Sequence, residues 1–389
     1  MYPFNKKIVS VEFSGIASIV NDANKLGDKV IRLEVGDVDY DAPIDVKIAV
    51  NKAINQNFTH YPPASGNEKL IDELIQRELY LYGKRISREN IYVTSGGSLG
   101  VYLSMQTILN SGDEIIVFEP AWPHFIEMAK LCGANVQRVS LSSENGFHID
   151  EAVLEEIDIS AKTKAILINT PNNPTGAILS EYELELIYEF ATANNLHVIC
   201  DEEYNSFCYT ASFSTLPSVK NSVVVRSFSK SYAIAGLRLG YVIGDEEWIK
   251  QIKKWGLFSC MYSSSIIQQG LSEALPRCDN FVYQMQDMFK RRADLFYQKV
   301  SRDGRYVFSK PEGSVYFWLD CREFIQDDVE FSKDLLYEKR IAVVPGSCFG
   351  ESGSGFIRIS LGARIDDLLY AAETIINELE RHKNVRLNM

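Results

Sequence analysis

The segment SFSKSYAIAGLRLGYVIG, residues 227–244, places two cations where they could bind or attack a small anionic molecule. Lys230 follows an apolar run, and Arg238 comes eight residues later, within Gly-Leu-Arg-Leu-Gly. A lysine amine can act as a nucleophile or a base, and the arginine fork can grip two oxygens of a phosphate or carboxylate. Because most lysines are solvated surface groups, the interpretation of Lys230 depends on the residues around it.

An acidic residue stands at the end of another apolar run, LHVIC, residues 196–200. Asp201 closes this run and Tyr204 follows it. Burying a carboxylate is costly unless a cation pairs with it, and open α/β sheets bind ligands at the C-terminal ends of their strands. Asp201 is therefore a candidate binding residue. The alternative is that it caps the next turn and that Tyr204 belongs to the core.

A third candidate is IYVTSGGSLG, residues 91–100, an expected strand that runs through Gly96, Gly97 and Ser98 into an expected helix. Glycines let backbone N–H groups approach an anion, and a helix N-terminus adds partial positive charge. The pattern is not G-x-G-x-x-G, which disfavours a dinucleotide. It indicates a phosphate site. The segment TPNNPTG, residues 170–176, predicts only a turn by itself.

The elements that must position these residues form an α/β series. Between about residues 88 and 245, apolar runs alternate with helical patterns, such as a helix over 181–195 with Ser180 as N-cap. Strands this continuously apolar are buried on both faces, so we expect a mostly parallel sheet between helices. The expected strands are 91–95, 114–120, 135–141, 164–170, 196–204, 222–230 and 239–244.

After about residue 275 the pattern changes and predicts a smaller α+β domain. The first 30 or so residues lack a strand that would begin the large sheet, so we expect them to fold against the C-terminal part. The small domain is then discontinuous, with residues 1–45 and 279–389 flanking a large domain of residues 46–278. The expected C-terminal elements are a helix over 279–301, the strands RYVFS and GSVYFWLD, a helix near 328–339, the strands IAVVP and FIRISL, and a closing helix.

Composition limits the partners and the compartment. The 389 residues are 46% hydrophobic and carry a net charge of −12, which disfavours nucleic acid and anionic membranes as partners. The seven cysteines are scattered without a C-x-x-C pair, as in a reducing compartment, and the five histidines are too far apart to predict a metal site. Neither a signal peptide nor a membrane span is evident, so we expect a soluble, cytoplasmic protein.

Three motifs in order resemble one family: S-x-S-K-x-x-x-x-x-G-L-R-x-G at 227–240, D-E-x-Y at 201–204 and N-P-T-G at 173–176. They resemble the class I/II aminotransferases, which are pyridoxal 5′-phosphate enzymes of fold type I, and the resemblance runs from about Leu33 to the C-terminal helix. It implies an aspartate aminotransferase-like fold, pyridoxal 5′-phosphate as cofactor, and transfer of an amino group between an L-amino acid and a 2-oxo acid.

The resemblance also implies catalytic roles. Lys230 matches the lysine that forms the internal aldimine and then moves the proton at the substrate α-carbon. Asp201 matches the partner of the pyridine nitrogen. Tyr204 and Asn173 match the pair that hydrogen-bonds the O3′ of the ring.

Further matches concern binding of the cofactor. Trp122 matches the aromatic residue that stacks on the pyridine ring, although it could also be ordinary core. Tyr61 matches a tyrosine that reaches the phosphate of a neighbouring subunit, which implies a homodimer. The residues matching a phosphate cup are Gly96, Gly97, Ser98, Ser227 and Arg238.

Arg358, in GFIRISLG, matches the arginine that binds the substrate α-carboxylate, helped by Asn173 and the backbone of Gly36. Val38 stands where the family commonly has proline, and Ser98 stands where aspartate-type relatives often have lysine. Serine leaves no evident partner for a second carboxylate, so we expect a neutral or aromatic amino acid as substrate. The candidate pocket residues are Phe13, Ile16, Trp122 and Tyr316.

Three alternatives remain. A lyase, decarboxylase or oxidase with the same cofactor could use the same lysine, aspartate and arginine, because the bond broken at the α-carbon depends on its orientation to the ring. A non-catalytic effector domain would need a DNA-binding domain, and only about 30 residues precede the fold. A nicotinamide-dependent oxidoreductase is supported by the βα alternation and contradicted by the glycine pattern.

Overall fold

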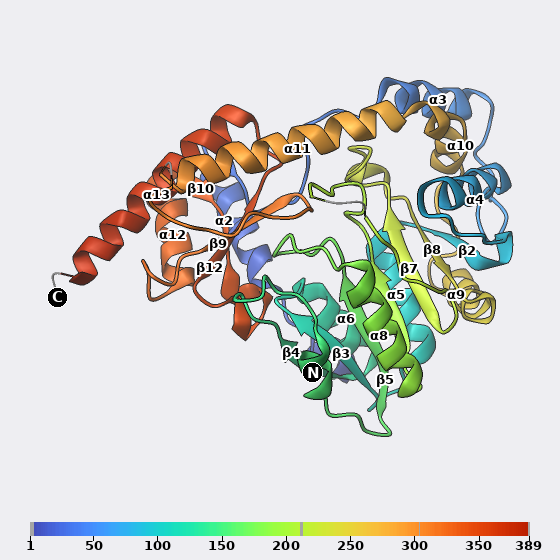
Figure 1. Cartoon of the computed structure of the whole chain (residues 1–389). Helices are drawn as coiled ribbons and strands as arrows, with labels where there is room; N and C mark the ends of the chain where they lie inside the picture. The colour runs from blue at the N-terminus through green and yellow to red at the C-terminus, as the bar shows by residue number, and fades with distance from the viewer. Residues whose placement is uncertain (1–3, 211–212, 303, 388–389) are drawn as a thin grey trace.

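A long helix, α11 (Asp279–Val300), connects the two parts of the molecule (Figure 1). The computed structural model describes residues 4–210, 213–302 and 304–387. One part contains a large sheet with helices on both sides, and the other gathers the C-terminal strands and helices. Within the described residues, no helix combines the length and the apolar character that crossing a bilayer requires.

The large sheet has seven strands in the order β2-β8-β7-β6-β5-β3-β4. Strand β8 runs antiparallel to both of its neighbours, and the other neighbouring pairs are parallel. All seven predicted strands are confirmed, most of them shorter than expected. Their bounds are β2 (Ile91–Thr94), β3 (Glu114–Glu119), β4 (Asn135–Ser140), β5 (Thr163–Asn169), β6 (His197–Asp201), β7 (Ser222–Ser227) and β8 (Gly240–Gly244).

Alternate residues of the central strands enter different cores, as the continuously apolar runs predict. Leu167 and Ile199 pack with α5, α6 and α9 on one face, whereas Ile166 and Val198 pack with α8 on the other. Ser180 caps α8 as expected, because its hydroxyl accepts the N–H of Glu183. The bounds are α5 (Gly97–Ile108), α6 (Pro123–Cys132), α7 (Glu151–Glu155), α8 (Glu181–Ala193) and α9 (Glu246–Ser259).

Three further helices, α3 (Ile44–Asn55), α4 (Glu68–Tyr82) and α10 (Ser265–Ala274), pack together and cover the end of the sheet at β2 and β8. The short 3₁₀ helices serve as connections. They are η1 (Arg88–Asn90), η2 (Ala235–Leu237), η3 (Leu275–Arg277), η4 (Gly346–Phe349) and η5 (Glu351–Gly353). Of these, η2 lies in the segment between Lys230 and Arg238.

The smaller part contains an antiparallel sheet with the strand order β11-β12-β9. One prediction is wrong, because RYVFS (305–309) forms no strand. Its Tyr306 and Phe308 both pack on Phe324. Their alternation therefore reflects packing on one aromatic side chain and not pairing with a neighbouring strand. IAVVP splits into two short strands. The bounds are β9 (Tyr316–Asp320), β10 (Ile341–Ala342), β11 (Val344–Pro345), β12 (Phe356–Ser360), α12 (Asp328–Lys339) and α13 (Ile365–Leu387).

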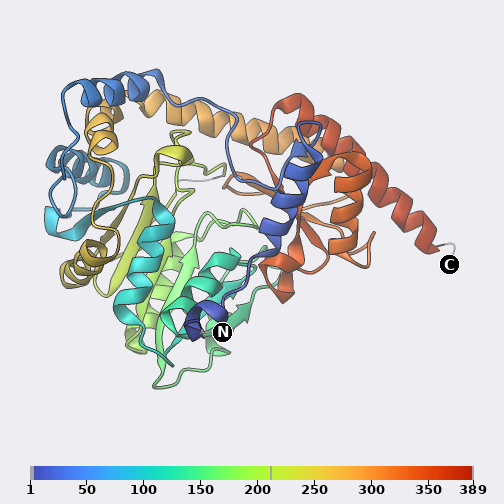
Figure 2. The same cartoon turned by 180° about the vertical axis from the view of Figure 1, so that it is seen from behind.

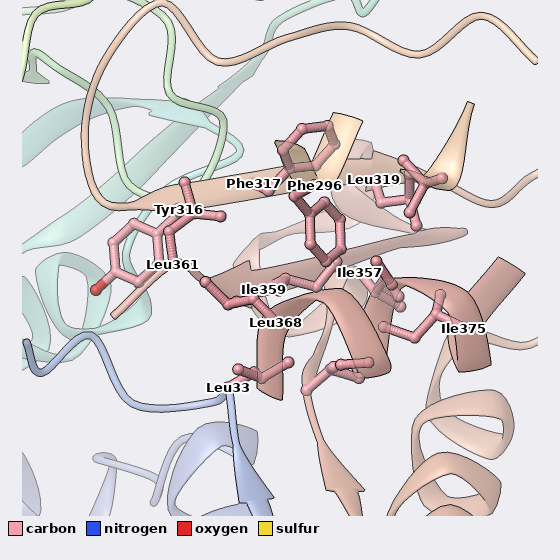
Figure 3. Close-up of a cluster of buried hydrophobic side chains, with 14 of the residues drawn as sticks. Leu33, Phe296, Tyr316, Phe317, Leu319, Ile357, Ile359, Leu361, Leu368 and Ile375 are labelled. Atoms are coloured by element: carbon pink, nitrogen blue, oxygen red, sulfur yellow. The ribbon is translucent and has the colours of Figure 1, made fainter. Parts of the chain in front are cut away.

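The N-terminal segment joins both parts. Strand β1 (Ile31–Arg32) pairs in parallel with β10, and Leu33 lies in the same core as Ile359 and Leu368 of the C-terminal part (Figure 3). Helix α2 (Gly15–Leu26) contacts β10 and β11. Helix α1 (Lys6–Val9) instead lies against α6, near the N-terminus in Figure 2, so the earliest residues depart from the expected packing. The division at 45/46 and 278/279 stays a prediction.

Candidate active site

A cavity of about 160 Å³ collects most of the predicted site residues. Its wall includes these predicted residues: Gly36, Gly97, Ser98, Trp122, Asn173, Asp201, Tyr204, Lys230 and Arg238. Tyr316, a predicted pocket residue, also lines it, and so do Phe125, Asn169, Glu203 and Ser229. Gly96, Ser227, Arg358 and Tyr61 are outside this wall, as are the pocket candidates Phe13 and Ile16, of which Phe13 is 98% exposed. The fold therefore brings together residues from four separate sequence motifs and from both parts of the molecule.

The sheet positions the cavity at one of its edges. Asn169 and Asp201 are register partners at the ends of the parallel strands β5 and β6. The Asn169 side chain donates to the Asp201 carbonyl at 2.9 Å and accepts the Asn173 N–H at 2.7 Å. The loop after β5 is therefore held against the end of β6, which places Asn173 beside the cavity.

Asp201 and Lys230 bring a buried acid and an amine into the same wall. Asp201 is 5% exposed, and burial, with the nearby Glu203 and Glu202 carboxylates adding to it, holds its pKa well above the usual range. The Lys230 side chain has no hydrogen bond or ion pair with the part of the chain that the structure describes. Asp201 therefore lacks a cationic partner there, and Lys230 keeps an available amine.

The N-terminus of α5 and Arg238 form an anion cradle. Gly96 is the N-cap of α5 with φ 92°, and a Cβ atom at this position would lie 2.5 Å from Arg238 Nη2. Only glycine combines this backbone conformation with so close an approach. Arg238 Nη1 donates to the Ala235 carbonyl at 3.0 Å, and in the described residues no carboxylate forms an ion pair with Arg238. The first N–H groups of α5 and the Arg238 charge can therefore receive an anion.

Two serines lie next to this cradle. Ser227 is not part of the cavity wall, and its hydroxyl is 2.9 Å from the Ser229 hydroxyl and accepts the Ser229 N–H at 3.1 Å. Ser229 is the serine that lines the cavity. The motif S-x-S-K contains both residues, so the sequence does not distinguish them.

Arg358 on β12 lies behind the cavity, in the small part of the molecule. It is 2% exposed, and its Nη1 donates to Asn173 Oδ1 at 2.9 Å while its Nη2 donates to the Glu34 carbonyl at 2.6 Å. The guanidinium also lies 4.2 Å from the centre of the Tyr316 ring. Its buried Nε has no partner within the described residues, so the arginine keeps a donor for a further acceptor.

Two tyrosines separate Arg358 from the rest of the cavity. The hydroxyls of Tyr204 and Tyr316 are 3.1 Å apart, and burial together with Tyr316 raises the pKa of Tyr204, which keeps its hydroxyl protonated. A Cβ atom on Gly36 would overlap the Tyr316 hydroxyl. Glycine at this position therefore lets the backbone approach both tyrosines and the arginine beyond them.

Trp122 lies at the start of α6 and lines the cavity. The ring of His124 stacks on Trp122 at 4.2 Å and 14°, and burial lowers the pKa of His124, so the imidazole is neutral. Phe125 packs on Trp122 edge-on at 5.3 Å. These contacts fix the orientation of the indole.

Tyr61 lies apart from the cavity wall. Its side chain is 79% exposed and packs on Tyr262 at 5.3 Å. The expected contact of Tyr61 with the site of a neighbouring subunit stays a prediction.

Sequence reasoning missed Asn169, Phe125, Ser229 and Glu203 as wall residues. Asn169 had a signal, because it lies near the end of the predicted strand, directly before TPNNPTG. Glu203 had one as well, since it is the third of three consecutive carboxylates in D-E-E-Y. For Phe125, the sequence offered no signal other than its position three residues after Trp122.

The wall fits pyridoxal 5′-phosphate, the cofactor that the motifs imply. A phosphate needs N–H donors and a cation, which the cradle of α5 and Arg238 offers. A pyridine nitrogen that stays protonated needs a buried carboxylate, which Asp201 offers without a competing cation from the described residues. An aldehyde carbon needs an amine, which Lys230 offers.

Comparison with known proteins shows the family of the chain. A model of the family described as "Aminotransferase class I and II" matches residues 28–375. An aspartate aminotransferase of Pyrococcus horikoshii is 31% identical over 388 residues, which cover 98% of each chain. The solved aspartate aminotransferase of Thermus thermophilus with maleate has a TM-score of 0.91 at 28% identity, covering 97% of this chain and 100% of that one.

A solved aromatic aminotransferase from Pyrococcus horikoshii is similar to nearly the same extent. Its TM-score is 0.87 at 29% identity, and the match covers 94% of this chain and 99% of that one. The relative named for aspartate and the relative named for aromatic amino acids are therefore similar to this chain at comparable identity and TM-score.

Proposed function

Because the chain belongs to the class I and II aminotransferases, which use pyridoxal 5′-phosphate, we propose that the cavity is its active site and that Lys230, Asp201 and Tyr204 are its catalytic residues. The enzyme transfers an amino group between an amino acid and a 2-oxo acid. The observation that carries the assignment is the pairing of an available Lys230 amine with a buried Asp201 in one cavity wall. This arrangement is uncommon unless a ligand supplies the missing charges.

The cofactor, when bound, supplies an electron-withdrawing ring and a carbon that accepts and returns the amino group. Lys230 holds the cofactor through its Nζ and then carries the proton to and from the substrate α-carbon. Asp201 keeps the proton on the ring nitrogen. The Tyr204 hydroxyl and the Asn173 side chain donate to the ring oxygen. Trp122, fixed by His124, covers one face of the ring.

The phosphate is assigned to Gly96, Gly97, Ser98, Ser227 and Arg238. The N–H groups at the start of α5 and the Arg238 guanidinium, which forms no ion pair with a carboxylate of the described residues, support this assignment. Ser229 joins this group, since it lines the wall in front of Ser227.

The α-carboxylate of the substrate is assigned to Arg358, Asn173 and the backbone at Gly36. Arg358 is buried without a carboxylate ion-paired to it in the described residues, and it already contacts Asn173. A buried arginine prefers a planar anion, and the substrate carboxylate is one.

We propose a neutral or aromatic amino acid as substrate. Ser98 offers no charge for a second carboxylate, and the aromatic side chains in the wall are Trp122, Phe125, Tyr204 and Tyr316. The cations in this wall are Lys230 and Arg238, and both already have roles. A kcat/KM for L-phenylalanine or L-tyrosine that exceeds the value for L-aspartate is expected, and the reverse order contradicts the proposal.

A homodimer in the cytoplasm is proposed for the assembled enzyme. The exposed Tyr61, which packs on the half-buried Tyr262, and the exposed Phe258 support a contact with a second copy. The buried free thiols of Cys132, Cys200 and Cys321 support a reducing compartment. Sedimentation equilibrium tests the dimer, and a monomer at micromolar concentration contradicts it.

One experiment tests the reaction and the lysine together. Wild-type enzyme loaded with pyridoxal 5′-phosphate is mixed with single amino acids, and loss of its yellow absorbance marks transfer of the amino group. An added 2-oxo acid restores the absorbance in an aminotransferase, whereas a lyase, decarboxylase or oxidase gives other products. Lys230→Ala is expected to lose turnover, and Lys254→Ala, on an exposed part of α9, serves as control. Turnover by Lys230→Ala at the wild-type rate contradicts the assignment.

A further inference from the structure

Glu203 places a carboxylate in the cavity wall that no role above uses. Its backbone is fixed, because it is the second residue after β6 and its N–H donates to Asp201 Oδ1 at 3.0 Å. Its side chain makes no hydrogen bond or ion pair with the described residues. The carboxylate is therefore held in the wall only by its short chain, and it can change position.

The Glu203 carboxylate lies beside the anion cradle. A Cβ atom built on Gly97 would lie 3.0 Å from a Glu203 carboxylate oxygen and 3.3 Å from Ser227 Cβ. Glu203 therefore reaches the first residue of α5, the same end of the helix that is assigned to the phosphate. Negative charge is favourable at a helix N-terminus, which gives the carboxylate a reason to lie there.

Arg238 lines the same cavity but is not ion-paired with Glu203 in the described residues. A carboxylate therefore lies beside the cradle without neutralising the charge of Arg238. A phosphate that enters the cradle brings its own negative charge close to this carboxylate, and like charges at short distance repel. A phosphate in the cradle therefore disfavours the position that the Glu203 carboxylate has in this structure.

We propose that the Glu203 carboxylate, which lies beside the phosphate cradle of the cofactor-free protein, competes with the phosphate of pyridoxal 5′-phosphate for the positive charge of that cradle. The competition lowers the affinity for the cofactor and speeds its release, so the cofactor is exchangeable. The inference rests on the proposed function, because it requires this cavity to be the cofactor site. Glu203 is a residue that sets cofactor affinity, and no part in proton transfer is assigned to it.

Glu203→Gln tests the competition, since it keeps the shape of the side chain and removes its charge. Cofactor-free wild type and variant are titrated with pyridoxal 5′-phosphate and separately with pyridoxal, which lacks the phosphate. For Glu203→Gln we expect the Kd for pyridoxal 5′-phosphate to fall at least about tenfold, which corresponds to ~1.4 kcal/mol, and its dissociation rate to fall as well. The Kd for pyridoxal is expected to stay within about twofold, because pyridoxal does not need the cradle.

Controls separate the possible failures. Glu246→Gln removes one exposed carboxylate at the opposite edge of the sheet and should leave both Kd values unchanged. Glu203→Asp shortens the reach of the carboxylate and should tighten pyridoxal 5′-phosphate binding less than Glu203→Gln does. This variant provides a second test if Glu203→Gln folds poorly. An unchanged Kd in Glu203→Gln and Glu203→Asp overturns the inference, as does an equal gain for pyridoxal. If wild type binds neither compound, the proposed function itself fails.

Discussion

Arg358 Nη1 donates a hydrogen bond of 2.9 Å to Asn173 Oδ1, and this bond joins residues 185 positions apart in the chain. Arg358 belongs to the antiparallel sheet of the small part, and Asn173 belongs to the loop after β5 of the large sheet. The contact therefore fixes the small part against the cofactor cavity. A substrate carboxylate bound there would contact both parts of the molecule at once.

Arg358→Lys is expected to lower kcat/KM for the amino acid roughly 100-fold, by ~2–3 kcal/mol, because lysine keeps the charge but loses the planar fork. The loss should appear mainly as a raised KM, measured by steady-state kinetics. Binding of pyridoxal 5′-phosphate should be unchanged, since Arg358 lies outside the cavity wall. Arg364→Lys, at an exposed position, is the control. An unaltered kcat/KM in Arg358→Lys would show that another residue binds the carboxylate.

Asp201→Asn is expected to separate stability from activity. In the cofactor-free protein the Asp201 carboxyl is buried without a cation, so an uncharged amide should leave the free energy of unfolding unchanged or higher. The amide cannot hold the proton on the ring nitrogen, so kcat should fall by ~10²–10³-fold. Urea denaturation and kcat measure the two effects. Asp201→Glu should recover part of the rate, and a fully active Asp201→Asn would exclude the assigned role.

Much of the fold could be predicted from the sequence because buried parallel strands are continuously apolar. The seven runs between residues 91 and 244 are all strands of the large sheet. The strand predicted for RYVFS was wrong because Tyr306 and Phe308 can pack on Phe324 without a neighbouring strand. The position of α1 could not be predicted, because it depends on one tertiary contact, from Lys7 Nζ to the Cys132 carbonyl at 2.9 Å.

The candidate site was predictable where residue type and spacing carry chemistry, as for Lys230, Asp201 and Arg238. The sequence does not predict which of two neighbouring side chains faces the cavity. Ser227 and Ser229 are both in the motif, and only the course of the turn after β7 places Ser229 in front. Glu203 was missed for the same reason, since a charged residue after a strand is more often solvated.

Replacing Arg226 should destabilise the protein strongly. Arg226 is 2% exposed, forms ion pairs with Glu78 and Glu202, and lies 4.0 Å from the centre of the Tyr82 ring. Arg226→Met leaves two buried carboxylates without a cation, so the free energy of unfolding should fall by ~3–5 kcal/mol. The double variant Arg226→Met with Glu78→Leu should lose less than the single variant. Urea denaturation measures both, and a loss under ~1 kcal/mol for Arg226→Met would contradict the expectation.

His148 should make stability depend on pH above neutrality. Hydrogen bonds with Glu183 and Glu312 raise the pKa of His148 from 6.5 to about 10. Since the folded state holds the proton more tightly than the unfolded state, this stabilisation is complete below about pH 6.5 and is lost progressively as the pH rises to about 10.

The size of this effect is limited because the His148 side chain is 31% exposed, so solvent screening should keep the contribution on the order of 1 kcal/mol. His148→Gln should be less stable than wild type at pH 6, and the difference should shrink towards pH 10. Thermal unfolding in a pH series measures this, with His382→Gln as a control on α13. A difference that stays constant from pH 6 to pH 10 would mean that the charge on His148 does not stabilise the folded state.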